Sequence, residues 1–285
     1  PDAQGQSGYV ACPPDPAATG PRPEHPRPDA CRARWRNLNG SWRFAFDPEV
    51  EGVAEEWYLD PDAHLDRTIE VPFPWQSTLS GVGEAREGVA WYARTFALSE
   101  AWRGQRVHLV VGAADWHATV WLNGKGAWTH EGGYAPFRLD VSEALRDGAN
   151  TLVIRVDDPG ADAEIPHGKQ GPPWYANVGG IWQTVWLEAS PQAWIKDFEL
   201  THPRDLGATP RVFDLRVRVA GVNQGEPSIS LWRQDDPLPV AAQLVGSARQ
   251  GDDVIVSLSV PFDDAWVWDP ADPRLVPLTI EACAG

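Results

Sequence analysis

The sequence predicts an all-β protein in which a jelly-roll β-sandwich is followed by an immunoglobulin-like β-sandwich. Short segments of alternating apolar and polar residues recur along most of the 285-residue chain, and turn-forming residues separate them. The chain contains 27 prolines and 26 glycines, which divide it into short pieces and disfavour long helices. Many short strands at this spacing are typical of sandwiches and jelly rolls.

The first sandwich is expected over residues 31–190, preceded by an extended, partly disordered arm of residues 1–30. The arm is rich in Pro, Ala, Gly and Asp and has almost no periodic apolar pattern. Asn123-Gly124 is a strong hairpin-turn signal, because both residues tolerate a positive φ. Strands are predicted for residues 42–46, 91–98, 106–111, 118–122, 137–141, 151–156 and 184–188, and short helices for residues 51–58 and 142–146.

The second sandwich is expected over residues 191–285, after a boundary at Ser190-Pro191. Six or seven strands in about 95 residues fit an immunoglobulin-like sandwich. The predicted strands cover residues 194–200, 213–219, 228–232, 240–245, 254–260 and 275–280.

The charge of the chain limits its partners. Lys and Arg number 24 and Asp and Glu number 40, which gives a formal charge of −16 at pH 7. An acidic surface repels the phosphates of nucleic acids and anionic membrane surfaces, so neither is an expected partner, whereas neutral sugars remain compatible. Since the sequence has no long apolar stretch, neither a transmembrane helix nor a signal peptide is expected, and secreted and cytoplasmic locations both stay open.

Cysteines and acidic residues give few signs of a metal or cofactor. Cys12 and Cys31 could form a disulfide in an exported protein, or these two and Cys283 could all be unpaired thiols. No cysteine and histidine spacing suggests zinc, and no organic cofactor is expected. Jelly rolls often hold a structural calcium ion between loops, and the candidate ligands for one are Asp140, Asp157 and Asp158.

Five motif blocks, in order along residues 25–281, resemble the two non-catalytic β-sandwich domains at the front of glycoside hydrolase family 2 enzymes. The blocks are HPRPDACRARWRNLNGSWRFAFD; VPFPWQS with GVAWYARTF; VWLNGKGAWTHEGGYAPFRLDVSEALRDGANTLVIRVDD; GGIWQTVWLE; and WDPADPRLVPLTIE. The β-galactosidases, β-glucuronidases and β-mannosidases of this family share them, so the blocks do not identify the sugar.

The resemblance implies a galactose-binding-like jelly roll and an immunoglobulin-like domain that bind carbohydrate or act as a scaffold, without catalysis of their own. In this family two Glu residues on a (β/α)₈ barrel perform retaining hydrolysis, and that barrel is expected as a partner domain rather than within these residues. Adjacent carboxylates such as Asp157-Asp158 point to opposite faces of a strand and cannot converge on one bond. Two alternatives stay open: a stand-alone carbohydrate-binding module, and purely structural domains with no sugar affinity.

Three loops, of residues 114–117, 128–134 and 165–177, combine aromatic and polar side chains. Such side chains can pack against the C–H faces of a sugar and bond its hydroxyls. The third loop, residues 165–177, resembles a segment near the active-site mouth of family members, and residues 84–89 are expected to face the same mouth. Trp174 occupies the position of the family's sugar-contacting Asp, and the aromatic residues of this loop could instead pack on the barrel. The candidate sugar-binding residues are Asp115, Trp116, His117, Trp128, His130, Tyr134, His167, Lys169, Gln170, Trp174 and Tyr175.

Other residues of the motif blocks are interpreted as structural. Arg94 lies between Tyr92 and Phe96 in a predicted strand, so we expect it to pair with a carboxylate or a backbone carbonyl. The Gly132-Gly133 pair permits a backbone path that a Cβ would block. Because they fall in strand patterns, four tryptophans are expected in the core: Trp42, Trp121, Trp182 and Trp186.

Overall fold

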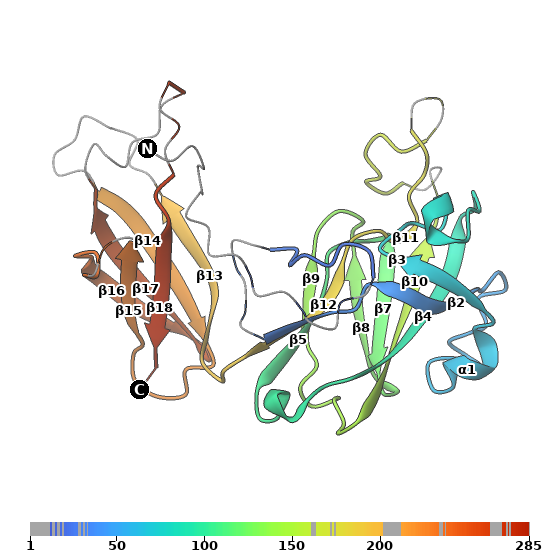
Figure 1. Cartoon of the computed structure of the whole chain (residues 1–285), viewed down its shortest axis with the longest axis horizontal. Helices are drawn as coiled ribbons and strands as arrows, with labels where there is room; N and C mark the ends of the chain where they lie inside the picture. The colour runs from blue at the N-terminus through green and yellow to red at the C-terminus, as the bar shows by residue number, and fades with distance from the viewer. Residues whose placement is uncertain are drawn as a thin grey trace. The chain divides into compact units, whose positions relative to one another are not determined.

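Both units of the chain are built from antiparallel β-sheets, which confirms the all-β prediction (Figure 1). The computed structural model describes residues 12–284 except 13–14, 16–17, 19, 28–29, 31, 33, 161–163, 172, 174, 202–211, 234–235, 237, 263–269, 272 and 274. The described residues from Cys12 to Ser190 form the first unit, and those from Pro191 onward form the second.

Two main sheets make up the first unit. One has four strands in the order β1-β12-β5-β9, the other has six in the order β3-β2-β4-β10-β7-β8, and β6 pairs with β11. The strands are β1 (Arg34–Asn37), β2 (Gly40–Phe46), β3 (Arg67–Val71), β4 (Gly88–Ala97), β5 (Arg106–Val111), β6 (Ala114–Asp115), β7 (His117–Leu122), β8 (Lys125–Glu131), β9 (Phe137–Asp140), β10 (Ala149–Asp158), β11 (Gly180–Ile181) and β12 (Val185–Ser190). The short helices are α1 (Pro61–His64), η2 (Thr78–Ser80) and η3 (Glu100–Trp102).

The main core of the first unit follows from alternation along the strands. Trp42 and Phe44 of β2 and Tyr92 of β4 are fully buried in one apolar cluster with residues of both sheets. Residues of the opposite parity, such as Ala45 and Trp91, form a second cluster on the other face of the six-stranded sheet. The predicted strands of this unit therefore match the observed ones because side chains alternate between faces with a period of two.

The predicted helices at residues 51–58 and 142–146 are both wrong, since the chain forms turns there and α1 begins only at Pro61. Asp47 holds the first of these segments, accepting hydrogen bonds from the N–H groups of Glu51 and Gly52 at 2.9 and 3.0 Å. Glu56 adopts a positive φ of 54°, which an α-helix does not allow. The segment instead places Trp57 over the second apolar cluster.

The described part of the N-terminal arm lies on the four-stranded sheet. The Asn37 backbone N–H donates to Asp15 Oδ2 at 2.8 Å, and the Asn37 side chain donates to the Arg22 carbonyl oxygen at 2.8 Å. The His25 ring packs edge-on against Trp35, with ring centroids 4.6 Å apart. These contacts cover the outer face of the sheet, where Trp35 and Trp186 are buried.

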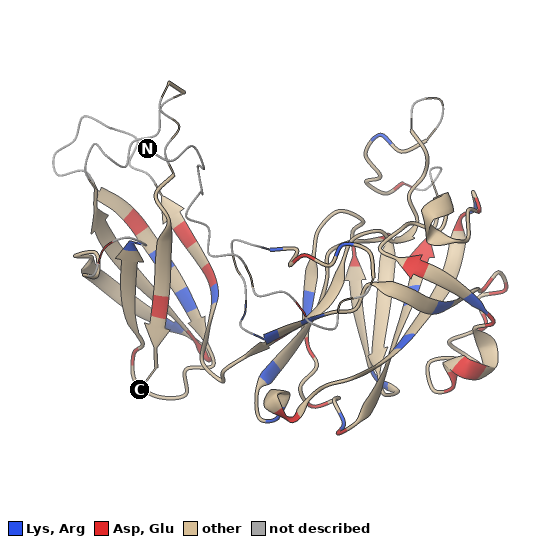
Figure 2. Ribbon diagram, viewed as in Figure 1, with Lys and Arg blue, Asp and Glu red and all other residues tan. Residues whose placement is uncertain are grey.

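In its described residues, the second unit has one four-stranded sheet, in the order β13-β14-β17-β16, and a two-stranded pair, β15-β18. Its core is aliphatic, with Val217 of β14 and Val256 of β17 among the buried residues. Acidic and basic residues face each other across neighbouring strands, as in the Arg218–Asp197 ion pair at 3.3 Å (Figure 2). The strands are β13 (Trp194–Thr201), β14 (Val212–Ala220), β15 (Ser228–Arg233), β16 (Gln243–Gln250), β17 (Asp253–Pro261) and β18 (Leu278–Cys283).

Cys12 and Cys283 differ in oxidation state. Cys12 takes part in a disulfide, and the expected partner, Cys31, lies outside the described residues. Cys283 is a free, exposed thiol. None of the helices in the described part of the chain is long and apolar enough to cross a membrane.

Candidate functional site

One glutamine side chain fixes the third candidate loop to the end of the first sandwich. Gln170 donates from Nε2 to Asp115 Oδ2 at 2.7 Å and to the Tyr134 hydroxyl oxygen at 2.9 Å. Its Oε1 accepts a hydrogen bond from the Val178 N–H at 2.5 Å. Tyr134 in turn donates its hydroxyl proton to the His167 carbonyl oxygen at 2.6 Å. We call Asp115, Tyr134, His167 and Gln170 the Gln170 network.

Asp115 is the buried end of this network. It closes strand β6 and is only 2% exposed. Burial raises the pKa of its carboxyl, while the hydrogen bond from Gln170 and the charge of His167 act in the opposite direction. Gly133 approaches so closely that a Cβ there would lie 2.5 Å from Asp115 Cγ, which confirms the prediction at this residue, whereas Gly132 is constrained by its φ of +124°.

A second buried carboxylate, Asp158, lies at the end of β10. Its Oδ1 accepts a hydrogen bond from the Gly160 N–H at 2.9 Å. Burial is the main cause that raises its pKa to about 6; the Gly160 hydrogen bond opposes the increase. The negative charges that add to the increase are those of Asp115, Glu87 and Asp157.

The backbone of Gly179 and Gly180, where β11 begins, packs closely beside Asp158. The Gly179 N–H donates to Gln76 Oε1 at 2.9 Å, across 103 residues of sequence. Gly180 has a φ of +83°, and a Cβ there would lie 2.6 Å from the Trp75 ring. Trp75 and Gln76 belong to the VPFPWQS block, and reasoning from the sequence did not assign either residue to the site.

The outer surface of the loop carries exposed side chains. Tyr175 is 59% exposed, and Lys169 is also exposed. Asn177 donates to Glu87 Oε1 at 3.4 Å, so the segment of residues 84–89 reaches this loop. Trp174 lies outside the described residues.

The other candidate aromatic and histidine residues lie in or beside the strands β6 to β8. Trp128 packs against the main core, and the His130 ring stacks on Phe137 with centroids 4.4 Å apart. Trp116 and His117 are half-buried where β6 leads into β7, and the Asp115–Trp116 peptide is cis. Asp115 and Tyr134 thus join the loop of residues 165–177, whereas Trp128 and His130 pack against residues of the sandwich itself.

Trp182 is a correction to the predicted core, while Trp42, Trp121 and Trp186 are buried as expected. Strand β11 ends at Ile181, so Trp182 lies beyond the strand and is only half-buried. Its Nε1 donates to the Gly133 carbonyl oxygen at 2.8 Å, and its ring stands edge-on to Tyr134 with centroids 6.1 Å apart. It therefore supports the Gln170 network.

The structure does not bring the three calcium candidates together. Asp140 accepts a hydrogen bond from the Ser142 hydroxyl at 2.6 Å and pairs with Arg106 at 3.2 Å. Asp157 pairs with Arg155 at 3.1 Å. Among the residues the structure describes, no group of three or more His, Cys, Asp or Glu side chains is placed to hold a metal ion.

Comparison with known proteins finds β-glucuronidases among the similar curated relatives. The β-glucuronidase of Paenibacillus borealis is 30% identical over 266 residues, which cover 86% of this chain and 42% of that protein. The β-glucuronidase of Felis catus is 28% identical over 273 residues, which cover 85% of this chain and 40% of that protein. The chain therefore spans about 40% of the length of these relatives.

Solved structures show the same architecture. A β-glucuronidase from an uncultured Clostridium species matches with a TM-score of 0.64 and 25% identity, over 88% of this chain and 43% of its own. A Ruminococcus gnavus β-glucuronidase matches with a TM-score of 0.61 and 23% identity, over 88% of this chain and 41% of its own, which shows the fold alone. Residues 35–191 match the family described as "Glycosyl hydrolases family 2, sugar binding domain". Since that match covers more than half of the chain, this protein belongs to glycosyl hydrolase family 2, and its first unit contains the family's sugar-binding domain.

Proposed function

We propose that this chain is the carbohydrate-recognition and scaffold region of a β-glucuronidase-type enzyme. Residues 31–190 contact the sugar, and residues 191–285 form an immunoglobulin-like support. Retaining hydrolysis takes place on a separate catalytic barrel, which brings two carboxyl groups to about 5 Å from each other. The activity named for the curated relatives supports a glucuronide as the substrate.

The Gln170 network is the observation that carries this proposal. It ties Gln170 to β6 and to Val178, two residues before β11, and the exposed ring of Tyr175 lies between Gln170 and Val178 in sequence. An ordered aromatic surface beside polar groups loses little conformational freedom when a sugar packs against it.

The charge of this end of the sandwich favours the hydroxyl groups of a sugar. Asp115, Asp158 and Glu87 lie close enough together to raise the pKa of Asp158. Carboxylates accept hydrogen bonds from hydroxyls, whereas they repel another carboxylate. The loop end is therefore suited to the neutral face of a glycoside rather than to the carboxylate of a uronate.

A glycan array followed by calorimetric titration of the full 285-residue chain tests the proposal. We expect a saturable glycan ligand whose affinity falls at least fivefold in Tyr175→Ala, because the exposed ring is removed. Val53→Ala, which truncates a side chain that is 50% exposed elsewhere in the first unit, should leave the affinity unchanged. 4-Nitrophenyl β-D-glucuronide should release no 4-nitrophenol.

Two outcomes would contradict the proposal. An array without any ligand would favour purely structural domains that meet sugar only in the presence of a catalytic barrel. Release of 4-nitrophenol by the purified chain would place catalysis within these residues.

A further inference from the structure

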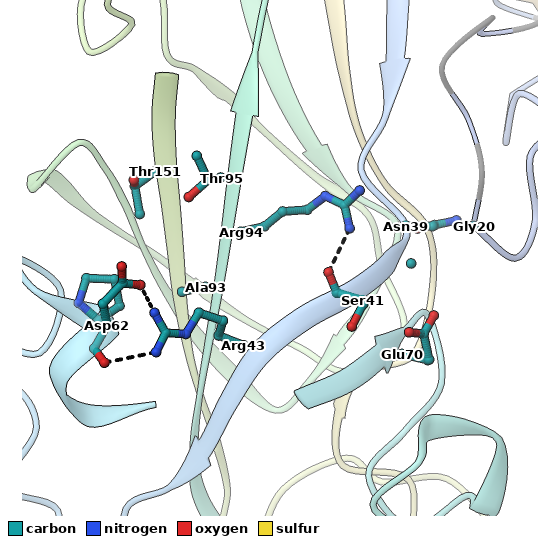
Figure 3. Close-up of a pocket in the computed structure, with 12 residues that line it drawn as sticks. Gly20, Asn39, Ser41, Arg43, Asp62, Glu70, Ala93, Arg94, Thr95 and Thr151 are labelled. Atoms are coloured by element: carbon teal, nitrogen blue, oxygen red, sulfur yellow. Dashed lines mark hydrogen bonds and ion pairs between the residues drawn. The ribbon is translucent and has the colours of Figure 1, made fainter. Parts of the chain in front are cut away.

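A pocket of about 600 Å³ opens on the six-stranded sheet, and Figure 3 shows the residues that line it. It lies towards the end of β4 that is far from Asp158. Asp158 pairs with Gly88 at the start of β4, whereas the pocket is lined by Ala93, Arg94 and Thr95 near its end. The lining is small or polar. This volume falls within the range of small-molecule sites.

The pocket exists because two neighbouring strands separate. The β2–β4 ladder runs from Phe46↔Ala90 to Arg43↔Ala93, although β2 begins at Gly40 and β4 continues to Ala97. Arg94 reaches across the gap and donates from Nη1 to the Ser41 carbonyl oxygen at 2.9 Å, which confirms the expected pairing with a carbonyl. Gly40 has a φ of +107° and no side chain to fill the gap.

The two arginines of the pocket differ in their ion-pair and hydrogen-bond partners. Arg43 is held by α1, since it pairs with the Asp62 carboxylate and donates to the carbonyl oxygens of Asp62 and Leu65 at 2.9 and 3.0 Å. Among the described residues, no carboxylate lies within ion-pair distance of the Arg94 guanidinium, and Ser41 supplies its hydrogen-bond acceptor. A guanidinium has five N–H donors, so Arg94 has donors beyond the one that bonds Ser41.

The surroundings of Arg94 favour an added negative charge. Its side chain is half-buried, and burial followed by the positive charge of Arg36 lowers its pKa, with Glu70 acting in the opposite direction. An anion at the guanidinium would relieve both effects. Figure 3 shows Thr95 and Thr151 on one side of Arg94 and Ser41 and Glu70 on the other, so hydroxyl-bonding groups flank it.

We infer that this pocket binds a hexuronate residue of a glycan, with the uronate carboxylate on the open face of the Arg94 guanidinium and the ring hydroxyls between Glu70 and the two threonines. The planar donor fork of arginine matches a carboxylate in two parallel hydrogen bonds. The choice of a sugar acid rests on the proposed function. The site differs from the Gln170 network in residues and in charge.

Calorimetric titration of the full chain with methyl β-D-glucuronide and with methyl β-D-glucoside tests the inference, because the two ligands differ only at C6. We expect the glucuronide to bind at least tenfold more tightly, and its affinity to fall as salt is added. Arg94→Gln should weaken glucuronide binding at least tenfold. Thr95→Trp should also weaken it, by filling the pocket from an exposed position without removing the Arg94–Ser41 bond.

Thr129→Trp is the matched control, since Thr129 is an exposed threonine of the same sheet on β8, outside the pocket. It should bind glucuronide like the unchanged chain. Three outcomes would overturn the inference. They are equal affinity for the two ligands, no binding of the glucuronide, and glucuronide binding that is unchanged in both Arg94→Gln and Thr95→Trp. Binding lost in Tyr175→Ala but kept in Thr95→Trp would also overturn it while leaving the proposed function intact.

Discussion

The two candidate sites of the first unit are built in opposite ways. At the Gln170 network, glycine backbone packs against buried carboxylates, and no room is left for a single Cβ at Gly133 or Gly180. At the Arg94 pocket, two strands separate and leave an open space lined by small and polar residues. Negative charge gathers at the first site, whereas a half-buried guanidinium dominates the second.

The two sites should therefore act differently: the Gln170 network positions a loop, and the Arg94 pocket binds the ligand directly. A close-packed network holds a loop in one conformation, so its contribution to sugar recognition depends on its geometry. An open pocket with unused donors contributes through charge and hydrogen bonds to the ligand itself. Substitutions at the network should therefore change stability, and substitutions at the pocket should mainly change affinity.

The largest loss of stability is expected for Gly180→Ala. The new Cβ would meet the Trp75 ring and would also occupy a left-handed conformation, which together should destabilise the first unit by roughly 2–4 kcal/mol. Urea unfolding followed by tryptophan fluorescence measures this change. The control is Gly246→Ala in the second unit, where a Cβ would meet nothing within 4 Å, so the free energy of unfolding should hardly change. Equal losses of stability in the two variants would contradict the close packing at Gly180.

Gln170→Leu should have the next largest effect. It removes the donor to the Asp115 carboxylate and the acceptor of the Val178 N–H, so buried polar groups lose partners at a cost of roughly 1–3 kcal/mol. Hydrogen exchange at the Val178 amide should become faster, while amides of β14 keep their protection. Unchanged exchange at Val178 would show that the loop does not depend on this glutamine.

Arg94→Met should cost less stability than Gln170→Leu. The substitution removes one hydrogen bond, to the Ser41 carbonyl oxygen, beside an already open pocket, so we expect a loss of about 1 kcal/mol. The same unfolding measurement applies. A loss above that of Gln170→Leu would mean that the arginine is a structural tie between the strands rather than a ligand group.

The smallest effect is a pH dependence from Asp158. Its pKa is raised in the folded state to about 6, so the folded chain binds this proton more tightly than the unfolded chain does. This contribution therefore makes the first unit less stable above pH 6, and the penalty disappears as the pH falls from about 6 towards the unfolded value near 4. Asp158→Asn should remove this part of the pH dependence, whereas Asp147→Asn, at an exposed position, should retain it. A carboxyl resonance of Asp158 that titrates near pH 4 would contradict the prediction.

The local alternation of apolar and polar residues was sufficient to predict many of the strands. Alternation predicted β2, β4 and β10, because each strand has one face in the main core and one in the second cluster. It failed at residues 51–58, where the Asp47 carboxylate and the close approach of Gly52 to Trp91 favour turns over a helix. Asp47 is close in sequence, but it is held by a hydrogen bond from Trp91 Nε1 across 44 residues, and a local pattern does not contain that contact.

The candidate site was predicted only in part. Mixed aromatic and polar loops identified Asp115, Tyr134 and Gln170, which the structure joins. The same rule also selected Trp128 and His130, whose positions on β8 give them local packing partners. Gln76 and the Arg94 pocket were not predicted, since one depends on a contact across 103 residues and the other on where a ladder between two strands ends.

Backbone chemical-shift mapping during titration with methyl β-D-glucuronide is the most direct test of the claim that the first unit contacts sugar. The account predicts saturable shifts at amides around Ser41 and Thr95 of the pocket, with further shifts at Val178 and Gly179 when a longer glycan ligand is used. Amides from Pro191 onward should not move. Shifts confined to the second unit, or no shifts at millimolar ligand, would contradict it.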